Sequence, residues 1–483
     1  MVFSSHLFVF YFLPVVLLIY YASPRRTKHL LLTLLSYVFY GWANPYFVFL
    51  MLGSTVVDYV CGLFISKQFG RRWSEPIEAL PRGESRSRGQ KIALAVSIAC
   101  NLSLLGFFKY FNFGVENYNR LTGALGLGGW DTFWRVTLPL GISFYTFQSM
   151  SYSIDVFRGD ARAIRNFTDF SCYVAMFPQL VAGPIVRFHE VADQLRRRTH
   201  TAEKFARGVA FFSLGLAKKV LLANACGKIA DTVFDAGSAT VLDSWYGAAA
   251  YAFQIYFDFS AYSDIAIGLG LFLGFVFPKN FDSPYRSQSI TEFWRRWHLS
   301  LSTWLRDYLY IPLGGNRKGR VRTYVNLIMV MLLGGLWHGA AWTFVAWSAI
   351  HAGMLVIERL QGKRSLYRRL PGAAKTGVTF VIVTVAWVFF RARDITSAGA
   401  YLANMVGLGP RQDGTGLVGG LIYQPYYVGC FFIAAAITWL APQTWDFTRR
   451  LSPARAAWCL FMLVVSLAVL TTQAFNPFIY FIF

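Results

Sequence analysis

Long apolar runs separated by short polar segments dominate the chain. Runs of about 16–25 apolar residues are long enough to cross a bilayer. Runs of this kind, single or doubled, occupy residues 5–22, 29–43, 45–65, 92–111, 136–157, 205–222, 245–277, 323–357, 376–390, 426–441 and 457–473. This pattern predicts an all-α polytopic membrane protein with about 12 crossings, or 11–13 transmembrane helices together with re-entrant segments. Residues 1–21 lack a basic leader and a small-residue cleavage site, so we expect a retained first helix.

Charge then gives the orientation. The chain of 483 residues carries 46 Lys and Arg against 24 Asp and Glu, a formal net charge of +22. Its basic residues gather in short segments between the apolar runs, at 25–28, 66–91, 278–322 and 359–375. Short basic loops face the cytoplasm, so we expect these segments inside and both termini outside. Only 14% of the residues are charged, and the charge pattern favours membrane topology over nucleic-acid binding.

Two apolar segments do not fit simple crossings. Residues 168–186 have basic flanks on both sides and contain Pro178 and Pro184, which break helices. We expect a re-entrant segment that is shielded from lipid by protein. The run 323–357 also begins and ends at basic loops, and so predicts an in-and-back hairpin that turns near Gly339-Ala340.

His338 is the sharpest candidate for chemistry, because it lies near the turn of that hairpin, away from the basic loops. Ionisable groups at membrane depth are costly and are therefore functional candidates. Gly335 and Gly339 flank it and allow a close approach of a neighbouring helix or a ligand. The alternative is a packing motif of the Gly-xxx-Gly type, in which the histidine only bonds a neighbouring helix.

Residues 289–307 predict an amphipathic helix at the membrane surface. Its apolar face comprises Trp294, Trp297, His298, Leu301 and Leu305, and its basic residues include Arg295, Arg296 and Arg306. A surface helix with snorkelling arginines explains this pattern. The functional alternative adds a phosphate-bearing cytoplasmic ligand, such as a nucleotide or coenzyme, for which arginine forks are suited.

Two acids, Asp258 and Asp264, lie in an unusually polar part of the run 245–277. They either relay protons, coordinate a cation, or hydrogen-bond neighbouring helices. The six cysteines show no CxxC or metal-type spacing with His, so no metal site is predicted. Walker, GxSxG and HExxH motifs are absent from the sequence.

Several motifs resemble the membrane-bound O-acyltransferase (MBOAT) family. They are the run from Asn280 to Tyr310 (NFDSPYRSQSITEFWRRWHLSLSTWLRDYLY), GGLWHG at 334–339, FPQLVAGP at 177–184 and the terminal FNPFIYFIF at 475–483. The likeness is strongest to the bacterial branch that acetylates exported polysaccharides such as alginate. It covers nearly the whole chain and implies a single membrane-embedded domain over 1–483, with a motif core at 278–357. Residues 401–455 resemble nothing familiar, which leaves the acceptor open.

The resemblance implies that His338 is the essential histidine and His298 the second motif histidine. It implies a helical ring around a central tunnel in the bacterial inner membrane, with a periplasmic N-terminus. Acetyl-CoA is then the acyl-donor substrate, with no bound cofactor or metal. Periplasmic acetyltransferase subunits and an exopolysaccharide acceptor are the expected partners, besides the lipid bilayer, and nucleic acid is not one.

From these expectations follow candidate residues for each part of the site. The donor-binding candidates are Arg295, Arg296, Arg306, Trp294 and Trp297. The tunnel-lining candidates are Gly335, Trp337, Gly339 and Asp258. His338 is placed to act as general base on an acceptor hydroxyl, or to carry the acetyl group itself.

Other functions compete with this interpretation. One is a transporter or flippase in which Asp258 and Asp264 couple ion flux. Another is an acyltransferase for a different envelope acceptor, such as peptidoglycan, cellulose or D-alanylated teichoic acid.

Overall fold

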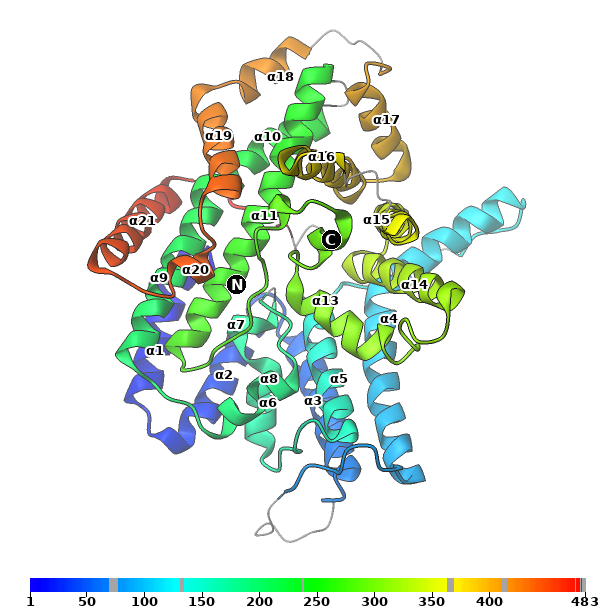
Figure 1. Ribbon diagram of the computed structural model, residues 1–483. Coiled ribbons are helices and arrows are strands. Elements are labelled where there is room, and N and C mark those ends of the chain that lie inside the picture. Colours follow the sequence, from blue (N-terminus) through cyan, green and yellow to red (C-terminus); the bar gives the residue numbers. More distant parts are fainter. Residues whose placement is uncertain are drawn as a thin grey trace. The chain divides into compact units, whose positions relative to one another are not determined.

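The computed structural model describes residues 1–68, 77–130, 134–181, 183–236, 239–362, 369–409, 415–473, 475–477 and 479 (Figure 1). Throughout these ranges the regular elements are helices. The chain forms two compact units: residues 1–205 with 269–278, and residues 206–268 with 279–483.

Unit 1 is a bundle of helices around buried polar side chains. Its α-helices are α1 (Leu13–Ala22), α2 (Lys28–Gly41), α3 (Tyr46–Ile65), α4 (Arg88–Ala124), α5 (Ile142–Arg158), α6 (Phe167–Ala175), α7 (Phe177–Leu180) and α8 (Phe188–Arg196). Helix α3 packs against both α4 and α5. At their contact Asn101 and Ser97 donate hydrogen bonds to the buried carboxylate of Asp58, the Ser97 bond being 2.6 Å long. A buried acid thus has its hydrogen-bond partners inside the bundle.

Unit 2 carries the two motif histidines. Helix α9 (Ala202–Ala217) leads into it and continues through a π-helical turn (Lys218–Ala223) into α10 (Asn224–Asp235). The following helices are α11 (Val241–Phe272), α12 (Ile290–Trp294), α13 (Leu299–Leu305), α14 (Arg320–His338), α15 (Trp342–Gln361), α16 (Gly372–Arg391), α17 (Ile395–Met405), α18 (Thr415–Ile422), α19 (Pro425–Leu440), α20 (Thr444–Phe447) and α21 (Pro453–Thr472).

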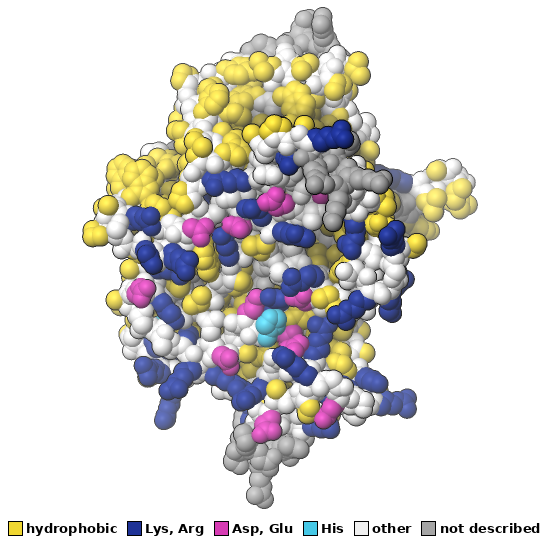
Figure 2. Space-filling view, viewed as in Figure 1, with side chains coloured by type: hydrophobic (Ala, Val, Ile, Leu, Met, Phe, Trp, Pro, Cys, Tyr) yellow, Lys and Arg dark blue, Asp and Glu magenta, His cyan; other side chains and the backbone are white. Residues whose placement is uncertain are grey.

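Five helical stretches of the described residues are long and apolar enough to cross a membrane. They are Tyr46–Ile65, Arg88–Ala124, Ala202–Asp235, Gly372–Arg391 and Pro453–Thr472, and two shorter apolar helices cover Leu7–Ala22 and Pro425–Leu440. The predicted all-α membrane fold is confirmed, and the chain is a multi-pass membrane protein. On the face shown in Figure 2, Lys and Arg side chains are more frequent than acidic ones, in keeping with the net charge of +22.

The two apolar runs 29–43 and 45–65, and the hairpin predicted over 323–357, agree with the structure. Helices α2 and α3 are joined by a short turn at 42–45, and α14 and α15 by one at 339–341. The segment 168–186 contains no long helix in its described residues: α6 ends at Ala175 and the four-residue α7 follows, with residues 170–180 buried. Whether this segment is re-entrant within the membrane stays a prediction. The single domain over 1–483 and the helical ring around a tunnel also stay predictions.

The prediction of one continuous helix over 289–307 is wrong. The structure has two short helices, α12 and α13, and His298 lies between them with a left-handed backbone, at φ 44° and ψ 57°. Some predicted features lie outside the described residues: 69–76 of the basic loop 66–91, 363–368 of the loop 359–375, Ala182 of the 177–184 motif, and 474, 478 and 480–483 at the C-terminal end.

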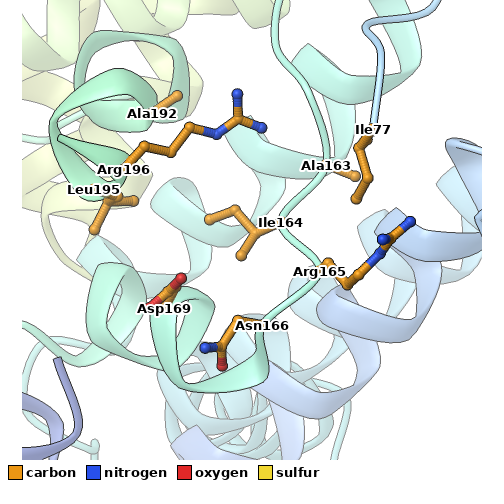
Figure 3. A pocket seen from close by; sticks show the side chains of 9 residues that line it. All are labelled: Ile77, Ala163, Ile164, Arg165, Asn166, Asp169, Ala192, Leu195 and Arg196. Carbon is orange, nitrogen blue, oxygen red and sulfur yellow. The ribbon is translucent and has the colours of Figure 1, made fainter. Parts of the chain in front are cut away.

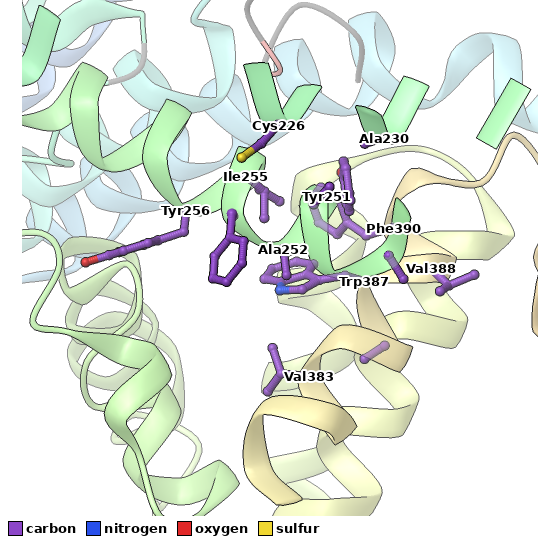
Figure 4. Packing of buried hydrophobic residues seen from close by; sticks show 14 of the residues in the cluster. Cys226, Ala230, Tyr251, Ala252, Ile255, Tyr256, Val383, Trp387, Val388 and Phe390 are labelled. Atoms are coloured by element: carbon purple, nitrogen blue, oxygen red, sulfur yellow. The ribbon is translucent and has the colours of Figure 1, made fainter. Parts of the chain in front are cut away.

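The core of unit 2 is rich in aromatic side chains (Figure 4). Trp387 lies at its centre, with ring centroids 5.1 Å from Trp297 and 5.5 Å from Trp347. Its indole N–H donates a 3.0 Å hydrogen bond to the hydroxyl of Tyr285, which in turn donates to the carbonyl of Ala252 on α11. Large rings that are both packed and hydrogen-bonded fix the positions of α11, α15 and α16 around the motif segment.

Candidate active site

Two glycines bring α14 and α15 together and so position His338, the last residue of α14. A Cβ atom on Gly335 would lie 2.3 Å from Ser348 Oγ, and one on Gly339 would lie 2.0 Å from the ring of Phe344. Both positions therefore exclude any larger side chain. Both glycines therefore pack helix against helix, as in the Gly-xxx-Gly alternative. That packing does not decide what His338 does.

His338 lies among aromatic rings. Its ring centroid is 5.1 Å from that of Trp337, 5.4 Å from Trp347 and 5.5 Å from Phe390. The ring of His298 lies 6.3 Å away. The structure therefore brings together two histidines that are 40 positions apart in the sequence: His298 is fully buried, and His338 is half-buried among aromatic rings.

His298 is fully buried and is held by Asn280. Its Nδ1 lies 3.1 Å from Asn280 Oδ1, and the same oxygen accepts hydrogen bonds from the backbone N–H and the hydroxyl of Ser300. The amide nitrogen of Asn280 donates a 2.8 Å hydrogen bond to Ser263 Oγ on α11. Asn280 thereby ties the motif segment to α11 at the point where the backbone of His298 turns left-handed.

This network fixes the tautomer of His298. The backbone N–H of Ser300 can only donate, so the atom of Asn280 that it meets is the oxygen. His298 Nδ1 must then carry the proton, which leaves Nε2 with its lone pair. Burial, and secondarily the nearby His338, lower the pKa of His298 well below its usual range, so the ring is neutral. Its Nε2 is thus a buried acceptor that can receive a proton or a hydrogen bond.

Unsatisfied nitrogen atoms surround the pair of histidines. Within the described residues, His298 Nε2, Trp347 Nε1, Trp294 Nε1 and both ring nitrogens of His351 are buried without a hydrogen-bond partner. The ring of His351 lies 5.1 Å from Trp347 and 5.3 Å from Trp294. Buried polar atoms without partners are rare and require an explanation, such as a catalytic role. They form a row of nitrogen-bearing rings that leads from Trp294 to His338.

The donor-binding candidates are placed differently from one another. Arg295 is exposed, whereas Arg296 is held by Glu292, with its Nε 2.9 Å from the carboxylate. Arg306 forms a two-bond pair with the adjacent Asp307, at 2.7 and 3.0 Å. Trp294 is half-buried and belongs to the row of rings, but Trp297 is buried in the core of unit 2. Their role in binding the acyl donor stays a prediction.

The two acids of α11 are each paired with a lysine of the π-helical turn. Asp258 lies 2.7 Å from Lys219 Nζ and also accepts a 2.8 Å hydrogen bond from the backbone N–H of Ile479. Asp264 lies 2.7 Å from Lys218 Nζ. These ion pairs agree with the alternative in which the acids bond neighbouring elements. No group of three or more His, Cys, Asp or Glu side chains suited to a metal ion occurs among the described residues.

Unit 1 has a separate cavity of about 250 Å³ (Figure 3). Arg196 of α8 extends its guanidinium over the cavity, and Arg165 and Asn166 line it from the segment before α6. Asp169, a further lining residue, is hydrogen-bonded to His29 Nδ1 at 2.6 Å. The cavity contains no residue of the histidine motifs, which belong to unit 2.

Three residues of the site were not predicted from the sequence: Asn280, Trp347 and His351. Asn280 opens the quoted motif, yet its role depends on a hydrogen bond to a residue 18 positions later. The predicted hairpin places Trp347 on the arm opposite His338, so the sequence could have indicated that the two side chains lie close together. His351 carries no local motif and becomes recognisable only through its burial.

The all-helical fold and the paired motif histidines are those expected of a membrane-bound acyltransferase, and comparison with known proteins agrees. The model of the MBOAT, membrane-bound O-acyltransferase, family matches residues 126–393. The chain belongs to this family and is a membrane-bound O-acyltransferase.

Particular relatives are similar over most of their length. The chain is 46% identical over 439 residues to the probable alginate O-acetylase AlgI of Pseudomonas aeruginosa, covering 89% of this chain and 81% of that protein. It is 43% identical over 505 aligned residues to the probable AlgI of Pseudomonas putida, covering 100% of both. It is also 36% identical over 446 residues to the peptidoglycan O-acetyltransferase of Helicobacter pylori, covering 84% of this chain and 80% of that protein. The predicted resemblance is confirmed.

Proposed function

We propose that the protein takes acetyl groups from acetyl-CoA on the cytoplasmic side and passes them across the inner membrane for O-acetylation of an exported, alginate-like polysaccharide. Periplasmic acetyltransferase subunits complete the transfer, and the N-terminus is periplasmic. Two alginate O-acetylases at 46% and 43% identity support the acetyl group and the class of acceptor. The basic residues at 278–322 support a donor that carries phosphates.

One observation carries the proposal: the two motif histidines lie side by side among aromatic rings, one half-buried and one fully buried, and unsatisfied buried nitrogens lie nearby. In the proposed reaction His338 accepts the proton of the acceptor hydroxyl as its oxygen attacks the thioester carbonyl. The C–O bond forms and the C–S bond breaks. The proton then passes from His338 to the departing thiolate, which gives an acetyl ester and free coenzyme A.

His298 supports this step as a positioning residue. Its neutral ring keeps a buried Nε2 without a partner, and Asn280 fixes the orientation of that ring. The aromatic rings around His338 leave it only half-buried, and by limiting the access of water they reduce hydrolysis of the thioester. Trp347 and His351 offer hydrogen-bonding nitrogens along the same row of rings.

The test measures acetyl-CoA consumption by the purified protein and polymer acetylation in the native host. His338→Ala should lower both at least 100-fold, since general acid–base catalysis contributes typically 10²–10⁴-fold. His6→Ala, a change at an exposed histidine in unit 1, is the matched control and should leave both unchanged. Normal polymer acetylation by a His338→Ala protein that is present at the usual level would overturn the proposal. Acetylation of purified peptidoglycan rather than the acidic polymer would change the acceptor and keep the chemistry.

A further inference from the structure

The C-terminal ends of α10 and α16 meet in unit 2. Arg391 at the end of α16 lies 2.7 Å from Asp231 of α10, and Arg393 lies 3.1 Å from Asp235. Both helices belong to stretches able to cross a membrane. Each stretch starts next to a segment whose basic residues predict the cytoplasm. Their meeting point therefore faces outwards, where an exported polymer is found.

A cleft of about 260 Å³ opens at this meeting point. Its polar lining includes Asp235, Arg393 and Asn404. Its apolar floor is the stacked pair of Phe234 and Tyr401, with ring centroids 4.0 Å apart and planes 11° apart. Pockets for drug-sized ligands hold about 300–1,000 Å³, so the volume suits a small unit such as one sugar ring.

Two side chains in the cleft keep hydrogen-bonding capacity. The side chain of Arg393 is 77% exposed, and only its Nη2 is engaged, by Asp235. A guanidinium has five donors arranged as a fork that fits a carboxylate. Asn404 also lines the cleft, and its side chain is 7% exposed. Its side-chain amide carries both donor and acceptor groups that suit the hydroxyls of a sugar.

The cleft and the candidate active site belong to the same unit. Phe390, next to Arg391 in the chain, contacts His338, with ring centroids 5.5 Å apart.

We propose that this cleft binds an acidic sugar unit of the acceptor, with the sugar carboxylate on Arg393 and its hydroxyls on Asn404. The proposal rests on the proposed function for its choice of acceptor. It adds a specificity site: Arg393 selects carboxylate-bearing polymers over neutral ones.

The experiment uses the full chain in lipid nanodiscs and titrates it with a hexuronate oligosaccharide and a neutral hexose oligosaccharide of equal length. Calorimetry should show that the uronate binds at least tenfold more tightly than the neutral oligomer. Arg393→Gln should weaken uronate binding about tenfold or more, because a charge-assisted hydrogen bond is lost. Asn404→Ala should weaken the binding of both oligosaccharides several-fold. Arg450→Gln removes an exposed arginine elsewhere in unit 2 and is the charge-matched control, with unchanged affinity expected.

Equal affinity of the wild type and Arg393→Gln for the uronate, or equal binding of both oligomers, would overturn the proposal. So would an Arg393→Gln protein that binds the uronate normally but loses polymer acetylation in cells, since the cleft would then dock a protein partner. His338→Ala separates the two proposals: it should keep uronate binding and lose acetyl transfer. Retained transfer in His338→Ala refutes the proposed function, whereas unaltered uronate binding by Arg393→Gln refutes only the cleft.

Discussion

Replacing Asn280 by Ala removes the amide that holds His298 in one tautomer. Four hydrogen bonds disappear: two from Ser300 at 3.2 and 2.9 Å, one with His298 Nδ1 at 3.1 Å, and one to Ser263 at 2.8 Å. The ring of His298 can then rotate or move its proton to Nε2, which removes the buried acceptor that faces the site. The substitution thus changes the chemistry of His298 without altering that residue.

The size of the effect follows from these bonds. A buried donor left without a partner costs about 1–3 kcal/mol. If the transition state is destabilised by about 2 kcal/mol, kcat/KM for acetyl transfer falls about 30-fold. We expect a loss of about 5–150-fold for Asn280→Ala, with kcat affected more than KM because Asn280 acts through His298.

Asn280→Asp is the matched variant. A carboxylate in this position still accepts from Ser300 and from His298 Nδ1, so the tautomer is kept. Its negative charge raises the pKa of His298. A protonated ring has no lone pair, so activity should be lost as the pH falls through the raised pKa and recovered at alkaline pH. The wild type should show no such loss, because burial lowers the pKa of its His298 well below the usual range.

The assay is acetyl-CoA turnover by the purified protein between pH 6 and pH 9, with thermal unfolding as the check on folding. The reasoning is refuted if both Asn280 variants are impaired equally at every pH. It is also refuted if Asn280→Ala, correctly folded, turns over acetyl-CoA at the wild-type rate.

Three further predictions concern packing, buried nitrogens and pH. Gly339→Ala places a methyl group 2.0 Å from the ring of Phe344 and should lower the free energy of unfolding by about 1–3 kcal/mol. Gly353→Ala, with open space around it, is the control and should not lower it. Equal unfolding midpoints of the two variants would contradict this. His351→Phe should reduce turnover at least tenfold while stability is kept or raised, because two unpaired buried nitrogens are removed; unchanged turnover would show that they have no role. The hydrogen bond to Asp155 raises the pKa of His189, so this pair stabilises the fold below about pH 6.5 and less as pH rises through the raised pKa; His189→Gln should abolish that pH-dependent part of thermal stability.

Much of the helical framework could be predicted from the sequence because it is marked by local signals. Asn44-Pro45 and Gly339-Ala340 interrupt apolar runs, and both hairpins turn there. Basic flanks at both ends identified the run 323–357 as two arms rather than one crossing. These signals need no knowledge of distant contacts.

The surroundings of His298 could not be predicted in the same way. Apolar and basic positions over 289–307 fit one amphipathic helix, yet the chain breaks at His298, which adopts φ 44°. The tertiary hydrogen bonds of Asn280 stabilise that break, and no local pattern encodes them. Tertiary contacts here override helix propensity.

The candidate arginines show a second limit. Arg296 lies four positions after Glu292, a helical spacing visible in the sequence, and the structure pairs them. Counting basic residues alone therefore overstates the charge available to a donor. Arg295 is exposed and is the better candidate of the two.

The central claim is that acetyl moves from cytoplasmic acetyl-CoA to an acceptor on the other side of the membrane through the site of His338. The most direct measurement uses proteoliposomes of one orientation, with radiolabelled acetyl-CoA on the cytoplasmic side and the periplasmic subunits and acidic polymer on the opposite side. We predict labelled ester on the polymer with the wild type and at least 100-fold less with His338→Ala. Labelled polymer at the wild-type rate with His338→Ala, or acetyl-CoA consumed with no label crossing the membrane, would contradict the account.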